Sequence, residues 1–223
     1  MNSFTYQYPV KNYFGEAFIK AEQLKEMATN LIVDPAMGEK VMLAYGGGSI
    51  KRTGLYDEIV AALQDAGKTV VEFPGIMPNP TYEKVQEGAR IAREEGVDFI
   101  LAVGGGSVFD CCKIVSAQVL LDEDIDDFEH VQDKTPTAFI PLGCVVTLSG
   151  TGAEQNNGGV ITNEATKVKG RGCGRFFVPS YTAQPSLRRY SSGLSHPSER
   201  FSSHRGSGFG RRRSATPSHA RRR

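Results

Sequence analysis

The chain has 223 residues, and its 39% hydrophobic content is sufficient for a buried core. Its net charge of +1 conceals two parts of opposite sign: residues 1–170 carry 14 Lys and Arg against 24 Asp and Glu, a net −10, whereas residues 171–223 carry 12 Arg against one acid, a net +11. A run of about 18 apolar residues and the basic and apolar start of a secretory signal are both missing, so we expect a cytoplasmic protein with no membrane partner.

The first part of the chain predicts strands that alternate with helices. Residues 40–46 predict a buried strand that ends in glycines, and residues 55–67 have apolar residues at helical spacing with a glycine stop. Residues 69–73 predict a second strand, which the turn-rich segment 75–80 closes. The second helix is expected over 81–96, with a threonine cap at its start.

The same unit then repeats. Residues 98–107 predict a third strand that runs into glycines, 108–121 a helix, and 137–146 a fourth strand. Residues 156–170, with β-branched residues after a double glycine, favour a β-ribbon over a helix. Strands that alternate with helices predict an α/β fold with a doubly wound, mostly parallel, Rossmann-like sheet.

From residue 171 onward the apolar periodicity stops. Residues 171–223 are mostly Ser, Arg, Gly and Pro, which cannot bury a core, so we expect a dinucleotide-binding domain over 1–170 and a disordered tail over 171–223. The tail resembles translation of a high-GC gene in a shifted reading frame, and under this preferred hypothesis no nucleic-acid partner is expected. The alternative is a nucleotide-binding module whose basic tail binds nucleic acid, since arginine-rich segments bind phosphate backbones.

Three glycine clusters stand at or near the ends of predicted strands, at residues 46–49, 104–107 and 147–152. Right-handed crossovers place these strand ends at one edge of the sheet. Glycines there let backbone N–H groups approach a phosphate, and the helix that follows turns its positive dipole end toward it. None of the clusters fits GxGxxG, and each alone is equally consistent with a plain turn. Three at one edge favour a phosphate-binding site.

Four segments, in their order and spacing, resemble the iron-type alcohol dehydrogenases, and within that family the butanol dehydrogenase-like, NADP(H)-dependent branch. They are YGGGSIKRTGLYD at 45–57, GIMPNPTYE at 75–83, AVGGGSVFDCCK at 102–113 and TLSGTGAEQNNGGVITNE at 147–164. The resemblance covers about residues 1–170 and none of the tail. It implies an oxidoreductase that transfers a hydride between NADP(H) and a small alcohol or aldehyde.

The resemblance also implies where the cofactor lies. The loop 104–107 would hold the pyrophosphate at a helix N-terminus through Gly105, Gly106 and Ser107, and Asn79 would lie beside the adenosine or nicotinamide end. Asp110 would lie near the nicotinamide. The alternative for Asp110 is an acid in the first helical turn that the helix dipole favours.

The nicotinamide ribose would lie against residues from the third cluster and the ribbon. Thr147, Leu148 and Thr151 match positions that line this ribose in the family, and Lys169 or Lys167 matches a lysine near a cofactor ribose. An exposed charge on a hairpin is the alternative for both lysines.

The choice between NAD and NADP depends on the first glycine cluster. An acidic side chain there would accept from the ribose 2′-OH and repel a 2′-phosphate, and the cluster holds none. Gly47, Gly48 and Ser49 leave room and donors, and Lys51 and Arg52 offer positive charge, although ordinary exposed charges are the alternative for these two. NADP(H) is therefore expected in preference to NAD(H).

Members of the family carry a catalytic divalent metal, iron or zinc, on an all-α C-terminal domain that supplies one aspartate and three histidines. The tail has no Asp, and no two of its histidines, His196, His204 and His219, lie one helical turn apart. We therefore expect that the all-α domain and the metal ligands are absent, and that the chain is truncated and inactive, with no catalytic residue assigned. A third hypothesis, an active domain with Asp110 or Glu154 as general base, lacks a partner His or carboxylate.

Overall fold

The computed structural model describes residues 11–15, 38–148, 150–172 and 180–185. All of them lie in the first of two units into which the chain divides, Met1–Tyr190; the second, Ser191–Arg223, lies outside the described residues.

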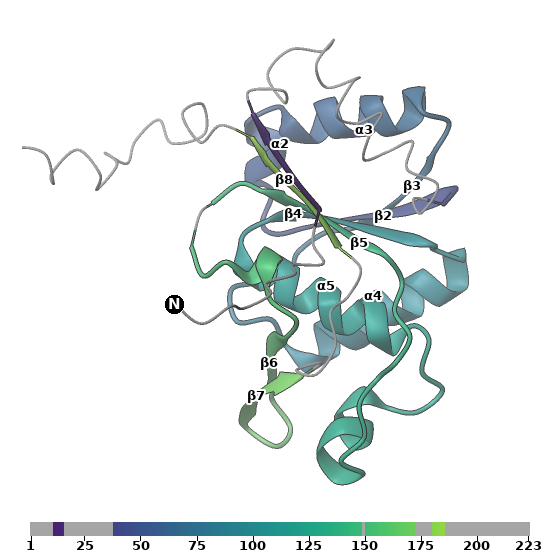
Figure 1. Cartoon of the computed structure of the whole chain (residues 1–223), viewed down its shortest axis with the longest axis vertical. Helices are drawn as coiled ribbons and strands as arrows, with labels where there is room; N and C mark the ends of the chain where they lie inside the picture. The colour runs from purple at the N-terminus through teal and green to yellow at the C-terminus, as the bar shows by residue number, and fades with distance from the viewer. Residues whose placement is uncertain (1–10, 16–37, 149, 173–179, 186–223) are drawn as a thin grey trace, which may run out of the picture. The chain divides into compact units, whose positions relative to one another are not determined.

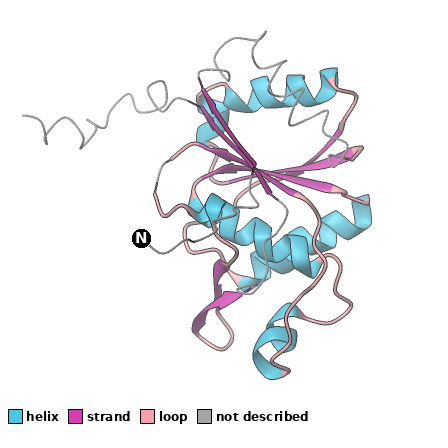
Figure 2. Cartoon of the chain, viewed as in Figure 1, coloured by secondary structure: helices cyan, strands magenta, loops and turns pink. Residues whose placement is uncertain are grey.

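The described unit is built on a six-stranded parallel sheet with the strand order β1-β8-β5-β4-β2-β3. Figures 1 and 2 show helices on both of its faces, α2 and α3 on one and α4 and α5 on the other. This arrangement confirms the predicted doubly wound, Rossmann-like fold. The strands are β1 (Lys11–Gly15), β2 (Lys40–Tyr45), β3 (Thr69–Phe73), β4 (Phe99–Gly104), β5 (Leu142–Val146) and β8 (Ser180–Pro185). The helices are α2 (Ser49–Arg52), α3 (Leu55–Asp65), α4 (Tyr82–Glu95) and α5 (Gly106–Gln118).

Two hydrophobic clusters, one on each face, hold the helices to the sheet. On one face, α3 packs Leu55, Ile59 and Leu63 against residues of β2 and β4. On the other face, residues of α4 and α5 such as Val85 and Phe109 pack against the same sheet. Parallel strands covered on both faces are apolar almost throughout, which explains why the core strands are visible in the sequence.

The ends of the helices and strands follow from local chemistry. The Thr81 side chain caps α4 by accepting a hydrogen bond from the N–H of Lys84, as predicted, and Gly96 ends the helix in a left-handed conformation (φ 66°). The strand predicted from residue 137 begins only at Leu142, directly after Pro141, which lacks the N–H that a strand ladder needs.

The predicted β-ribbon is present as β6 (Gly159–Asn163) and β7 (Val168–Gly172), which pair antiparallel. It lies against α5, where a Cβ on Gly159 would come within 2.5 Å of the carbonyl oxygen of Asp110. The Thr162 N–H donates to the carbonyl of Pro80, which ties the ribbon to the start of α4. Two short helical segments, η2 (Asp127–Val131) and η3 (Ala153–Gln155), complete the described elements.

Besides η2 and η3, the described residues form three elements that the sequence does not predict, α2, β1 and β8. The helix α2 has four residues, which is too short for any periodicity to show. The strands β1 and β8 pair with each other, and β8 also pairs with β5. Strand pairing uses backbone groups that every residue but proline carries, so Ser180–Pro185 extends the sheet although it lies in the segment expected to be disordered. The rest of that segment beyond Gly172 lies outside the described residues, and the domain boundary at Gly170 stays a prediction.

No helix among the described residues is long and apolar enough to cross a bilayer.

Candidate functional site

The three glycine loops meet at the carboxyl edge of the sheet. The strands that precede them, β2, β4 and β5, are neighbours in the order β5-β4-β2. The N–H of Thr147 donates to the carbonyl of Gly104 across 2.9 Å, and that of Gly75 donates to the carbonyl of Gly46 across 3.3 Å. The three loops therefore lie at one edge of the sheet, where ligands of parallel α/β folds bind.

The helix α5 opens at this edge with an uncapped N-terminus. Gly105 is its N-cap residue, no side chain accepts from the N–H groups of the first turn, and that turn holds no acid. Backbone N–H groups without a side-chain cap and the positive end of the dipole, at the start of a 13-residue helix, favour the binding of an anion. Asp110 is the fifth residue of α5, beyond the first turn, so the helix-dipole interpretation of this side chain is wrong.

The loop after β5 lies directly against this helix N-terminus. A Cβ on Gly106 would stand 2.9 Å from the Thr151 hydroxyl, and a Cβ on Gly105 would stand 3.8 Å from the Leu148 Cβ. Leu148 is 67% exposed at this edge. The structure thus brings together residues that the sequence assigned to the pyrophosphate and to the nicotinamide ribose, and glycine is needed at 106 for the close approach.

A buried lysine, Lys113, fastens the same loop to α5. Its side chain is 3% exposed, and its ammonium donates to the carbonyls of Ala153 and Gly158 and to the Asn156 Oδ1. The carboxylate of Asp110 lies 3.8 Å away. Sequence reasoning missed Lys113, although a single lysine inside the apolar helical segment 108–121 was a usable signal, because such a cation must be paired.

A hydrogen bond of 2.8 Å joins the Lys169 Nζ to the Asn79 Oδ1, 90 residues apart in the chain. Asn79 holds a left-handed backbone (φ 54°) in the turn that precedes α4, and Lys169 projects from β7. Lys167 occupies the turn between β6 and β7 with φ 56°. Of the two candidate lysines, Lys169 is the one in contact with another predicted cofactor residue.

The first glycine cluster is open. A Cβ on Gly47 or on Gly48 would meet no atom within 4 Å, and Gly48 has the positive φ (88°) that favours glycine. Ser49 begins α2 and is exposed, as is Arg52 at its end. The cluster thus offers space and donors at the sheet edge.

An acid that sequence reasoning missed reaches Lys51 in α2. Glu72 in β3 lies 3.4 Å from the Lys51 ammonium, and its carboxylate also accepts from the hydroxyls of Tyr45 (2.6 Å) and Tyr56. The ammonium lies 4.3 Å from the ring centroid of Tyr56. The signal was present: an acid at the end of the second strand, about 20 residues after a glycine loop, is the usual ribose-binding position in dinucleotide folds.

The charges in this cluster perturb one another. The two phenol hydroxyls, Tyr45 foremost, lower the pKa of Glu72, and the hydrogen bond to Glu72 raises the pKa of Tyr56 to about 12. The pKa of Lys51 is raised, chiefly by its interaction with Tyr45. All three shifts favour an ionised carboxylate and a protonated ammonium held together.

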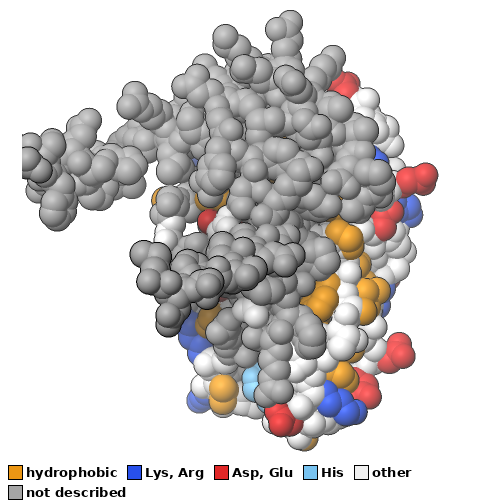
Figure 3. Space-filling model, viewed as in Figure 1, with side chains coloured by type: hydrophobic (Ala, Val, Ile, Leu, Met, Phe, Trp, Pro, Cys, Tyr) orange, Lys and Arg blue, Asp and Glu red, His pale blue; other side chains and the backbone are white. Residues whose placement is uncertain are grey.

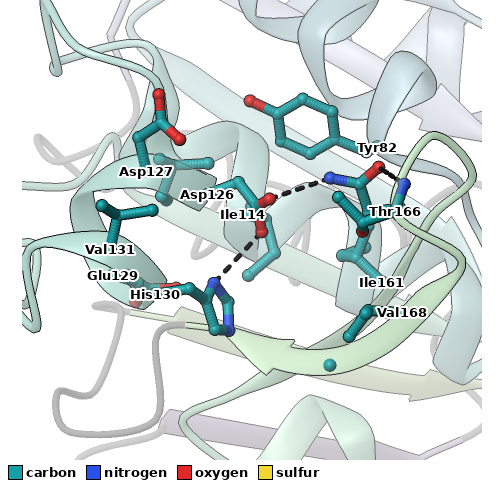
Figure 4. Close-up of a pocket in the computed structure, with 13 residues that line it drawn as sticks. Tyr82, Ile114, Asp126, Asp127, Glu129, His130, Val131, Ile161, Thr166 and Val168 are labelled. Atoms are coloured by element: carbon teal, nitrogen blue, oxygen red, sulfur yellow. Dashed lines mark hydrogen bonds and ion pairs between the residues drawn. The ribbon is translucent and has the colours of Figure 1, made fainter.

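A cavity of about 300 Å³ lies elsewhere, between η2, the ribbon and α5. On its wall, Asp126 accepts from the Asn163 amide at 2.8 Å and lies 3.1 Å from the His130 Nδ1, as the dashed lines in Figure 4 mark. Ribbon residues alternate in direction, so Ile161 lines this cavity, whereas Lys169 contacts the turn before α4. None of the predicted cofactor residues lines it.

Within the part of the chain that the structure describes, no group of three or more His, Cys, Asp or Glu side chains is placed to hold a metal ion. On the face seen in Figure 3, the described surface mixes acidic, basic and hydrophobic side chains. The described residues visible there form no extended basic surface of the kind that nucleic acids bind.

Comparison with known proteins identifies relatives of this chain. The sequence model of the family described as iron-containing alcohol dehydrogenase matches residues 9–183. The probable NADH-dependent butanol dehydrogenase 1 of Bacillus subtilis is 44% identical over 171 residues, which are 76% of this chain and 41% of that protein. The NADPH-dependent aldehyde reductase YqhD of Escherichia coli is 40% identical over 173 residues, again 76% of this chain and 41% of the relative.

The fold is also found among solved structures. The NADH-dependent butanol dehydrogenase A of Thermotoga maritima matches with a TM-score of 0.69 at 36% identity, over 84% of this chain and 46% of that one. The chain thus spans less than half the length of these relatives. Since the family model covers most of the sequence and the sheet matches that of a solved butanol dehydrogenase, the chain belongs to the iron-containing alcohol dehydrogenase family.

Proposed function

We propose that this chain binds a nicotinamide dinucleotide at the carboxyl edge of its sheet and serves hydride transfer between that cofactor and a small alcohol or aldehyde. The observation that carries the proposal is the uncapped N-terminus of α5, set against the loop 147–152 by the close approach of Gly106 to Thr151. The printed activities of the relatives, butanol dehydrogenase and aldehyde reductase, support the substrate class.

Each loop has a separate task in this proposal. The N–H groups that follow Gly105 bind the pyrophosphate, with Gly106 and Ser107 allowing the backbone to approach it. Thr147, Leu148 and Thr151 form the wall on which the nicotinamide ribose lies, and exposed Leu148 excludes water from it.

The β6–β7 ribbon forms the other end of the proposed cofactor site. The bond between Lys169 and Asn79 holds two hydrogen-bonding groups at a fixed separation beside the cofactor. Asp110, close to the buried Lys113 ammonium, supplies an oriented carboxylate near the start of α5.

The cofactor carries the hydride, and the chain contributes binding and orientation. The divalent metal that the family resemblance implies, iron or zinc, finds no group of three ligands within the described residues. We therefore assign none of these residues a catalytic or metal-binding role.

We further propose that NADP(H) is preferred to NAD(H). The open space at Gly47 and Gly48 supports room for a 2′-phosphate, and Ser49 and Arg52 supply a hydroxyl and a cation nearby. Lys51 lies beside them in an ion pair with Glu72. The relatives include both NADH- and NADPH-dependent enzymes, so either cofactor is compatible with this family.

The test is titration of the full chain with NADPH, followed by nicotinamide fluorescence, for the wild type and for Gly105→Asp. Position 105 has ordinary backbone angles and Asp is a favoured N-cap residue, so the variant keeps the fold while its carboxylate occupies the anion position. We expect saturable binding by the wild type and an affinity loss of at least about 100-fold in the variant, the scale of a close like-charge contact.

Gly105→Asn is the matched control, because it has the same shape and capping ability without the charge. We expect it to lose much less affinity than Gly105→Asp. Equal NADPH affinity in the wild type and in Gly105→Asp, with both chains folded by circular dichroism, would place the phosphate elsewhere and refute the proposed site.

A further inference from the structure

Both carboxylate oxygens of Glu72 accept hydrogen bonds from neighbouring side chains. Its Oε2 accepts from the Tyr45 hydroxyl at 2.6 Å and from the Lys51 ammonium at 3.4 Å, and its Oε1 accepts from the Tyr56 hydroxyl. The pairing of β2 with β3 sets Glu72 opposite Leu43, two residues before the end of β2. Its partner Lys51 lies in α2, which begins at Ser49 directly after the glycines 46–48, so the ion pair links β3 to the helix that follows this cluster.

Lys51 is held from two sides. Besides the carboxylate, its ammonium lies over the rings of Tyr56 and Tyr45, at 4.3 and 5.3 Å from their centroids. The Tyr45 and Tyr56 rings in turn meet edge to face at 5.7 Å. An ammonium in contact with a carboxylate and two aromatic faces is already paired, and a phosphate would have to compete with those partners for it.

The pair remains reachable from solvent. The Lys51 and Glu72 side chains are 48% and 43% exposed. A group bound at the first glycine cluster would therefore meet a neutral pair in place of a free ammonium.

We propose that Glu72 is a specificity-determining residue that acts through Lys51: it holds the ammonium in a neutral pair against Tyr45 and Tyr56, which limits the preference for NADPH and keeps the site open to NADH. This inference rests on the proposed function, since it concerns the adenosine ribose of the same cofactor. Glu72 acts here as a positioning residue, and its effect is expected in the ratio of the two affinities.

The experiment compares NADH and NADPH dissociation constants of the full chain for the wild type and Glu72→Gln. Glutamine keeps an acceptor for one tyrosine hydroxyl, can donate its amide N–H to the oxygen of the other, and removes the charge that neutralises Lys51. We expect NADPH to gain about fivefold in affinity relative to NADH, the scale of one partly exposed ion pair, and the gain to shrink at high salt.

Two further variants isolate the route of the effect. Asp57→Asn removes one exposed acid from the first turn of α3, next to Tyr56, and should leave the ratio unchanged. Lys51→Gln should change the wild-type ratio by less than about twofold, because the ammonium is already neutralised, and should abolish the gain in the Glu72→Gln background.

Each outcome decides the inference. An unchanged ratio in Glu72→Gln, or the same gain in the absence of Lys51, overturns it. A large loss of NADPH affinity in Lys51→Gln alone also overturns it, and this variant needs no change at Glu72. Binding of neither nucleotide by the wild type instead removes the proposed function itself, so the two failures are distinguishable.

Discussion

Lys113 is a single side chain that holds a whole loop in place. Its ammonium is the donor for two backbone carbonyls and one amide oxygen of the segment 153–158, and it is almost fully buried. A buried ammonium is tolerated only when nearly all its hydrogen bonds are made, and its buried acceptors would likewise be left unpaired without it. Lys113 thus supplies three of the hydrogen bonds that hold the loop carrying Thr151 to α5.

Lys113→Met should therefore destabilise the fold by about 2–4 kcal/mol, because three acceptors lose their donor at once. Urea unfolding followed by circular dichroism measures this change. Arg90→Met, which breaks an exposed pair with Glu94 on α4, serves as control and should cost less than about 0.5 kcal/mol. Similar losses in the two variants would contradict the tethering role of Lys113.

Glu72 makes stability depend on pH. Its pKa in the folded chain lies below its ordinary value of 4.5, so its ionised form stabilises the fold above that value. This contribution is lost as the pH falls through the lower, folded-state pKa. The wild type should accordingly exceed Glu72→Gln in stability at neutral pH, and the difference should vanish in strong acid.

Unfolding free energies of both proteins between neutral pH and about pH 3 measure this dependence. We expect a difference below about 1 kcal/mol at neutral pH, because the side chain is partly exposed. A difference that stays constant as the pH falls would show that the charge of Glu72 contributes nothing.

At the scale of elements, the β6–β7 ribbon depends on one close contact with α5. Gly159→Ala would bring a methyl group to 2.5 Å from the Asp110 carbonyl and 3.1 Å from Ile114, and backbone cannot yield as a side chain can. The ribbon must then move away from α5, which should cost about 1–3 kcal/mol.

Thermal unfolding tests this prediction, with Gly150→Ala as control, since a Cβ there would meet no atom within 4 Å. The displaced ribbon should also pull Lys169 from Asn79 and weaken NADPH binding. A Gly159→Ala protein as stable as Gly150→Ala would show that the ribbon is not fixed by this contact.

The elements also show what the sequence can predict. The strands β2, β4 and β5 are buried almost throughout, and the helices α3 and α4 each pack one apolar stripe against the sheet, so their local sequence patterns predict them. The strands β1 and β8 are stabilised by pairing between residues some 170 positions apart, which no local pattern records. In the site, the glycine loops and Asn79 were predictable. Glu72 and Lys113 each left a signal in the sequence, but their partners Lys51, Tyr45, Ala153 and Gly158 are known only from the fold.

At the scale of the whole molecule, the cysteines report on global opening. Cys111, Cys112 and Cys144 are free and buried in the core. Burial raises the pKa of Cys111 and of Cys144 to about 12, and that of Cys112 is also raised, so the reactive thiolate is scarce at neutral pH.

In a Cys173→Ser chain, which keeps only these three thiols, a disulfide reagent should label the native protein very slowly and the urea-unfolded protein completely. The labelling rate against urea should follow the unfolding curve measured by circular dichroism. Rapid labelling without denaturant would mean that the α5 side of the core opens locally.

The strand order sets the order in which the strands can pair during synthesis of the chain. The neighbours β5, β4, β2 and β3 come from one stretch of chain and can pair as soon as residue 146 has left the ribosome. The strand β1 pairs with β8, so its backbone groups have no strand partner until about 165 further residues have been synthesised. Contacts of such high sequence separation form slowly and expose an unpaired edge meanwhile. Translation rate and chaperone supply should therefore govern the yield of this protein more than its final stability does.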